Sequence, residues 1–312
     1  MMTPESTILF NLAKRVALAH SVHPLARAAM VTGSVAKGIA DHYSDIDMSI
    51  YYRDGLPEEE WLAGVRTRLG AQERKWLVEN REEGSVMEAY LLDGVEVQIV
   101  HTTIAAWNDA IDTVLVKLEV ESPLQKALEG TLACVPLFGA EYIEEWKERA
   151  AVYPEALAEA MVRKYMNFFP VWGLLGQFST RDATVWYHHV LVESAQNIIG
   201  VLAGLNHLYF TTFQFKRMGR LIGEMTIAPA GLGRRLERLF HAPMPEALCE
   251  VEALVGETLA LVCEHMPQVD TSAASKRIGW RQEAWGPVEQ EPAPAGITAE
   301  PPHHPHDAGA HC

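Results

Sequence analysis

Residues 31–52 read VTGSVAKGIADHYSDIDMSIYY, and this stretch decides how the N-terminal part of the chain folds. It continues from RAAMVTGS (27–34), a β-like run that leads into a glycine-bounded turn. The turn, Gly33–Gly38, is expected to open a short helix. The segment from Ile46 to Tyr52 then predicts a second strand. The pattern is therefore strand, turn and strand, with the polar residues gathered around the turn.

Two carboxylates, Asp45 and Asp47, stand at the start of the second strand. Side chains alternate along a strand, so both carboxylates are predicted to project from one face. Ile46, Met48 and Ile50 then point to the opposite face, against the core. Two carboxylates so close repel each other unless a cation compensates them, and Mg²⁺ is the natural choice. An arrangement of two Mg²⁺ ions is expected here.

A third carboxylate from a neighbouring strand would complete such a site. Glu96, in VEVQIVH (95–101), is the main candidate. Alternation places it on one face with Gln98, so that it can bind metal or accept a proton from a substrate hydroxyl. Glu88 on the preceding strand and Asp93 in the turn between the two strands are the alternatives.

The turn after the first strand has features that suit a phosphate group. Gly33 lets the backbone come close to a phosphate, and the Ser34 hydroxyl and following amides can hydrogen-bond its oxygens. A short string of this kind is common and indicates little alone. Its meaning comes from the D-x-D pair about a dozen residues later and the Glu96 strand further on.

The remaining pattern predicts two structural regions and a tail. Residues 1–139 predict an α+β domain, a small mixed sheet with helices packed on one face. Asp93-Gly94, between strands at 86–92 and 95–101, is a hairpin signal. Residues 140–267 predict an all-α helical bundle. The expected helices are 4–20, 57–70, 103–118, 141–152, 154–177, 180–206, 212–225, 232–240 and 245–265. Residues 268–312 predict a disordered tail rich in Pro, Ala and His.

The overall composition limits the partners and the compartment. The chain has 312 residues and a net charge of −15, from 26 Lys+Arg against 41 Asp+Glu. This charge disfavours a nucleic-acid partner. Neither a signal peptide nor a membrane-spanning run is recognised. Three cysteines lie in apolar segments with helical character: Cys134, Cys249 and Cys263. They are predicted to be reduced core residues, so a cytoplasmic location is expected.

The histidines of the tail raise a separate question. His303, His304, His306, His311 and Cys312 are ligands that a transition metal can use. The alternative is a tail without function that binds metal adventitiously.

The run GSVAKG…SDID, with VEV further on, resembles the nucleotidyltransferase superfamily that includes DNA polymerase beta and the antibiotic nucleotidyltransferases. Glu96-Val97-Gln98-Ile99-Val100 is similar to the third-carboxylate strand of aminoglycoside adenylyltransferases. Those proteins also join the catalytic domain to a C-terminal helical bundle. The motifs cover about residues 25–105, and the helical half is similar in architecture only.

This resemblance implies a role for each candidate residue. Gly33 and Ser34 would contact a nucleoside triphosphate, Asp45 and Asp47 would hold Mg²⁺, and Glu96 would complete the acid triad. Lys37 lies in the nucleotide-binding turn as a departure in residue type, at a position that these families vary, so its role is open. In the helical halves of related proteins a lysine can reach the triphosphate, which makes Lys216 a candidate; the alternative is an ordinary surface charge.

The implied reaction is attack of a hydroxyl on the α-phosphorus of a nucleoside triphosphate, with release of pyrophosphate. The expected donor is ATP, and the expected acceptor is a small hydroxylated molecule. Transfer to a protein or RNA is one alternative, and a catalytically weak nucleotide-binding protein of the same fold is another. The acidic balance counts against RNA, and the intact Asp45, Asp47 and Glu96 count against loss of activity. The sequence does not define the oligomeric state.

Overall fold

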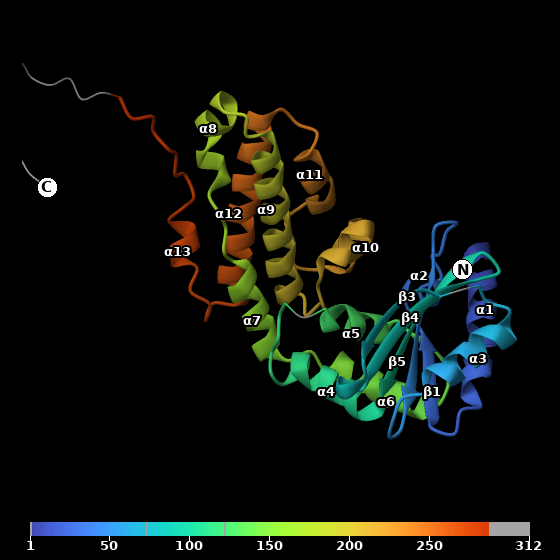
Figure 1. Cartoon of the computed structure of the whole chain (residues 1–312). Coiled ribbons are helices and arrows are strands. Elements are labelled where there is room, and N and C mark those ends of the chain that lie inside the picture. The colour runs from blue at the N-terminus through green and yellow to red at the C-terminus, as the bar shows by residue number, and fades with distance from the viewer. Residues whose placement is uncertain (1, 73, 122, 287–312) are drawn as a thin grey trace, which may run out of the picture. The chain divides into compact units, whose positions relative to one another are not determined.

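The computed structural model describes residues 2–72, 74–121 and 123–286. Within this part of the chain, residues up to Arg281 form one compact unit, and residues 282–286 fall outside it. The unit has a mixed α/β region in its N-terminal half and a helical region in its C-terminal half (Figure 1), as the sequence predicts.

A six-stranded mixed sheet is the centre of the N-terminal region. Its strand order is β3-β4-β5-β2-β1-β6, and only the β2–β5 pairing is parallel among the described strands. The strands are β1 (Ala26–Val31), β2 (Ile46–Tyr52), β3 (Arg74–Asn80), β4 (Ser85–Leu92), β5 (Val95–Thr103) and β6 (Val135–Phe138). The predicted hairpin is confirmed: β4 and β5 pair antiparallel across Asp93-Gly94.

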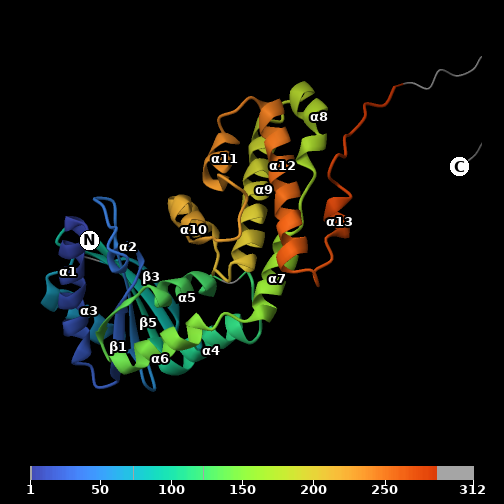
Figure 2. The same cartoon turned by 180° about the vertical axis from the view of Figure 1, so that it is seen from behind.

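Helices cover both faces of this sheet, so the prediction of helices on one face is wrong. The helices of the first face are α1 (Pro4–Ser21) and α3 (Glu59–Leu69), and those of the second are α4 (Ile104–Leu115), α5 (Leu124–Leu132) and α6 (Ala140–Ala151). Figures 1 and 2 show the two groups on opposite sides of the strands.

The strands carry apolar side chains of both parities, which explains the second helical layer. Ile46, Met48 and Ile50 face the first layer, as predicted from their alternation. Met30 and Tyr51 point the other way and pack in one core with Trp146 of α6. A sheet that is apolar on both faces needs cover on both.

The sequence did not predict the two edge strands. β3 reads RKWLVEN and is largely exposed. Its charged residues protect this open edge of the sheet from pairing with another strand. β6 contains Pro136, which has no backbone N–H to donate, yet Pro136 pairs with Met30 at the other edge. A proline is tolerated there because β6 has a neighbour on one side only.

The helical region contains more breaks than predicted. Its elements are α7 (Glu155–Tyr165), the 3₁₀ turn η2 (Val171–Gly173), α8 (Leu175–Thr180), α9 (Thr184–Leu205), the 3₁₀ turn η3 (Thr212–Arg217), α10 (Met218–Glu224), α11 (Leu232–Arg238) and α12 (Met244–His265). The single helix predicted over 154–177 is wrong, because Pro170 cannot continue a helix begun by α7. The helix predicted over 212–225 divides into η3 and α10.

Residues 267–281, which we call the C-terminal strap, are ordered against the helices and contain the short helix α13 (Ser272–Ser275). Val269 and Ala274 are buried in the core of the helical region. The Trp172 Nε1 donates a hydrogen bond to the carbonyl oxygen of Arg277 at 3.1 Å. The predicted disorder from residue 268 is therefore wrong for the strap, which is held by hydrogen bonds between its backbone and side chains of other elements, and these leave no periodic pattern in the sequence. The predicted tail beyond residue 286, with its histidines and Cys312, lies outside the described residues.

The cysteines differ in burial. Cys134 is buried as predicted, whereas Cys249 and Cys263 are exposed, so their assignment to the core is wrong. All three are free thiols. Within the described residues, no helix combines the length and the apolar character needed to cross a membrane.

Candidate active site

Strand β2 places the two aspartates beside β5. Asp45 directly precedes β2 and Asp47 lies on it, and the parallel register sets Asp47 next to Gln98. Gln98 Nε2 donates to Asp45 Oδ2 at 2.9 Å and to Glu96 Oε1 at 3.0 Å. Strand alternation thus brings Asp45, Asp47, Glu96 and Gln98 to one face, as the sequence predicts.

Glu96 has a partner that the sequence did not reveal. Lys75 of β3 forms an ion pair with it. The hydrogen bond from Lys75 lowers the pKa of Glu96 below its usual value. The carboxylate is therefore on the predicted face and ionised, but it is held by an ammonium group. Its role as third metal ligand stays a prediction.

The two alternatives to Glu96 lie elsewhere. Glu88 pairs with Ile99 in the β4–β5 register, so it belongs to the opposite face, where it is fully buried and bound to Arg66. Asp93 forms an ion pair with Arg15 at 2.9 Å. Of the three predicted candidates, Glu96 shares a face with Asp47.

The turn after β1 lies directly against the Asp47 carboxylate. Gly33 has a φ of +63°, and a Cβ built on it would lie 2.3 Å from Asp47 Oδ2. The backbone N–H of Thr32 donates to the carbonyl oxygen of Asp47 at 2.9 Å. Gly33 and Ser34 begin the short helix α2 (Gly33–Ala36) at this point. The predicted phosphate-binding turn and the predicted metal-binding pair are thus in contact.

Lysines from three elements partly offset the burial of Asp47 and the charge of Asp45. Burial, and next the Asp45 carboxylate, raise the pKa of Asp47 above its ordinary value. The ammonium groups of Lys126, Lys216 and Lys37 act in the opposite direction. Lys37 and Lys216, both predicted from the sequence, therefore lie near the aspartates.

Helix α5 contributes two charged residues that sequence reasoning missed. Lys126 Nζ lies 4.7 Å from the centre of the Phe213 ring in η3. Glu129, one helical turn further on, forms an ion pair with Lys37. No motif marks either residue, and no helix is predicted from the sequence over α5.

Asp45 and Asp47 suit a hard divalent cation. They offer oxygen ligands on one face, and their mutual repulsion is relieved by a cation. Among residues 2–72, 74–121 and 123–286, no three His, Cys, Asp or Glu side chains are grouped as ligands of one ion. Mg²⁺ commonly binds through one or two carboxylates together with substrate phosphates, and this donor set fits that mode.

An ion pair also joins the loop before the aspartates to the helical region. Arg217 of η3 donates to the Asp41 carboxylate at 2.8 Å. Asp41 lies in the loop between α2 and Asp45 and accepts a further hydrogen bond from the Tyr43 backbone at 3.0 Å. Lys216 is thus carried by a segment that is bonded to the loop before the aspartates.

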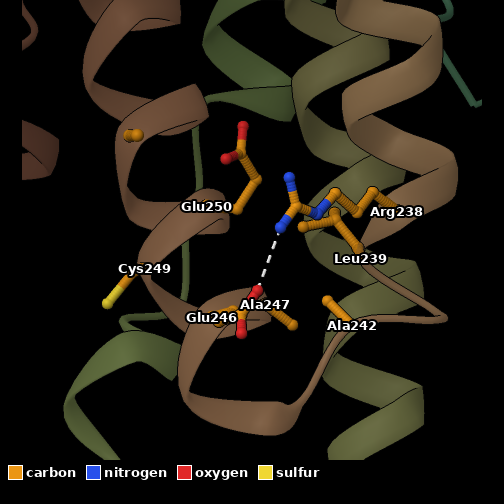
Figure 3. Close-up of a pocket in the computed structure, with 8 residues that line it drawn as sticks. Arg238, Leu239, Ala242, Glu246, Ala247, Cys249 and Glu250 are labelled. Atoms are coloured by element: carbon orange, nitrogen blue, oxygen red, sulfur yellow. Dashed lines mark hydrogen bonds and ion pairs between the residues drawn. The ribbon is translucent and has the colours of Figure 1, made fainter.

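The concavity between α11 and α12 is a separate feature. Figure 3 shows it, with Arg238 directed at Glu246 across a 3.0 Å ion pair. Its lining also includes Cys249 and Glu250, and none of the predicted site residues. The candidate active site is therefore at the sheet and not in this pocket.

Comparison with known proteins gives distant structural similarity alone. No family model matches the chain. No curated protein matches it either. Among solved structures, it is similar to a nucleotidyltransferase-like protein from Exiguobacterium sibiricum, with 12% identity, coverage of 83% of this chain and 80% of that chain, and a TM-score of 0.37. It is also similar to a chain of the GLD-2/RNP-8 complex, with 12% identity, coverage of 81% and 78%, and a TM-score of 0.28. What this chain does has to follow from the residues of its own site.

Proposed function

We propose that this chain is a Mg²⁺-dependent nucleotidyltransferase that moves a nucleoside monophosphate, AMP from ATP, to a hydroxyl of a small molecule. The observation that carries the proposal is the contact between Gly33 and Asp47, with Asp45 on the same face and three lysines around the pair. Carboxylates suit a cation, and the lysines suit the polyanion that accompanies it.

In the proposed reaction the acceptor hydroxyl attacks the α-phosphorus of the triphosphate. A new bond forms between the α-phosphorus and the acceptor oxygen. The bond between the α-phosphorus and the oxygen that bridges it to the β-phosphorus breaks, and pyrophosphate leaves with that oxygen. Asp45 and Asp47 would hold Mg²⁺, which when bound neutralises phosphate charge. Lys37, Lys126 and Lys216 offset the negative charge of the triphosphate and of the departing pyrophosphate.

The acceptor proton needs a base on the same face. Glu96 is the proposed acceptor of that proton, since Gln98 links it to Asp45. Its pairing with Lys75 keeps it ionised before the reaction. The Gly33–Ser34 turn supplies backbone and hydroxyl groups for the phosphates.

The test is an acceptor screen with ATP labelled at the α-phosphate, in the presence of Mg²⁺. Wild type should release labelled product and pyrophosphate, and Asp47→Asn should be slower by about 100-fold or more. Asp93→Asn is the matched control, because it removes the same charge at a surface ion pair away from the site. Equal rates for wild type and Asp47→Asn would overturn the proposal.

A further inference from the structure

Asp47 is surrounded by ammonium groups but paired with none of them. Lys37, Lys126 and Lys216 all act on its carboxylate electrostatically. Yet in the described part of the chain no lysine, arginine or histidine forms an ion pair with Asp47. A half-buried carboxylate near flexible lysines would ordinarily attract one of them.

Two of the three lysines have a visible restraint. Lys37 is bound to Glu129, and both side chains are largely buried, with exposed fractions of 15% and 25%. Lys126 lies over the Phe213 ring in a cation–π contact. Both restraining groups come from elements outside the motif-bearing turn, Glu129 from α5 and Phe213 from η3.

The backbone of Lys37 is tied to the turn that contacts Asp47. Lys37 caps α2, and its backbone N–H donates to the carbonyl oxygen of Gly33. Gly33 in turn lies against the Asp47 carboxylate. The backbone of Lys37 is thus bonded to the residue that contacts Asp47, and the direction of its side chain sets how near the two charges lie.

We propose that Glu129 is a positioning residue that holds the Lys37 ammonium away from Asp47, so that the Asp47 oxygens stay free for a cation. This inference rests on the proposed function. Without Glu129, Lys37 turns to Asp47 and occupies the oxygens that the cation needs. An arriving triphosphate competes with Glu129 for the same ammonium and leaves Asp47 untouched.

The first test is a thermodynamic cycle without metal or nucleotide. Asp47→Asn should raise the melting temperature of the wild type, because it removes a half-buried charge that Asp45 repels. In a Glu129→Gln background this gain should vanish, since Lys37 then pairs with Asp47. In a Glu129→Gln, Lys37→Met background the gain should return.

Two controls make the cycle specific. Glu144→Gln, which breaks an exposed ion pair with Lys147 on α6, should leave the gain from Asp47→Asn intact. Circular dichroism checks that each variant is folded. An equal gain in the wild-type and Glu129→Gln backgrounds, or none in the wild type, would overturn the inference.

The second test measures Mn²⁺ affinity by calorimetry, with Mn²⁺ as the probe for Mg²⁺. Glu129→Gln should weaken binding about tenfold, as expected for a competing partly buried ion pair, and adding Lys37→Met should restore it. Unchanged affinity in Glu129→Gln would count against the positioning role. If wild type and Asp47→Asn bind Mn²⁺ equally, the proposed metal site fails, while the cycle still decides whether Glu129 restrains Lys37.

Discussion

At the scale of single residues, Gly33 meets two requirements at once. Its φ of +63° is unfavourable for other residues, and its missing side chain leaves room for Asp47 Oδ2. Gly33→Ala should therefore cost about 1–3 kcal/mol of stability and abolish cation binding and transfer, since the new methyl group displaces the carboxylate.

A matched variant separates the two effects. Gly70 ends α3 with a φ of +73°, and a Cβ added to it would meet nothing within 4 Å. Gly70→Ala should lose a similar amount of stability in urea unfolding but keep its cation affinity. If Gly33→Ala binds Mn²⁺ like Gly70→Ala, the contact between Gly33 and Asp47 does not shape the site.

The site residues differ in how far the sequence could reveal them. Asp45, Asp47 and Glu96 follow from strand alternation, which is a local rule. Lys126, Glu129 and Lys75 belong to elements that meet the aspartates only after the chain has folded. Neither α5 nor β3 is among the predicted elements, and a sequence pattern does not show which charged side chain will face another element.

At the scale of elements, the C-terminal strap is fixed to α12 by Glu252. The Glu252 carboxylate binds Arg281 and also accepts a hydrogen bond from the backbone N–H of Gly279 at 2.7 Å. The hydrogen bond from Arg281 is the main cause that lowers the pKa of Glu252 from its ordinary 4.5. A carboxylate whose pKa is lowered by folding stabilises the fold at pH values above its pKa in the unfolded chain. That contribution is lost as the pH falls through its pKa in the folded protein.

The lowered pKa of Glu252 predicts that the effect of Arg281→Met on stability depends on pH. At pH 7 the variant should be less stable by about 1 kcal/mol, a charged hydrogen bond discounted for solvent screening. The difference from wild type should shrink as the pH drops below 4.5, because Glu252 becomes protonated in both proteins. Melting curves between pH 7 and pH 3 measure it.

Arg238→Met is the control for the strap. It breaks an ion pair with Glu246 whose two side chains are both mostly exposed, at 67% and 56%. Its effect should be small at every pH. A constant difference between Arg281→Met and wild type across this range would exclude Glu252 as the titrating partner.

Edge strands and the strap mark the limit of element prediction. Ile46–Tyr52 agrees with its predicted bounds to the residue, because buried Ile46, Met48 and Ile50 alternate clearly with more exposed residues along most of the strand. β3 and β6 are edge strands, where charge and proline obscure that alternation. The strap is held by hydrogen bonds to the Trp172 and Glu252 side chains, and such contacts depend on tertiary structure alone.

At the scale of the whole molecule, one hydrophobic core joins the sheet to the helical region. Tyr51 of β2, Trp146 of α6 and Leu191 of α9 belong to the same buried cluster. The predicted division between residues 139 and 140 passes through this cluster, next to the contact of α6 with β1. Whether residues 1–139 fold alone stays a prediction.

Trp146 provides the test of that division. It is 1% exposed, and its ring centre lies 4.4 Å from that of Tyr51. Trp146→Ala should cost about 3–5 kcal/mol. Because the core is shared, hydrogen exchange should lose protection in β2 and α9 together.

Trp285 supplies the comparison, since it is 89% exposed and its replacement by alanine should change nothing. Loss of protection in β2 with α9 unaffected by Trp146→Ala would mean that the two halves unfold as separate domains. In that case the boundary predicted from the sequence would hold in spite of the shared core.

The pairing of β1 with β6 has a consequence for synthesis on the ribosome. β1 ends at Val31, whereas β6, its neighbour on the side away from β2, begins only at Val135. During translation the β1 edge therefore stays open until more than a hundred further residues have emerged. An unpaired strand edge attracts other chains, so the nascent protein passes through a long interval in which chaperones have an exposed edge to protect.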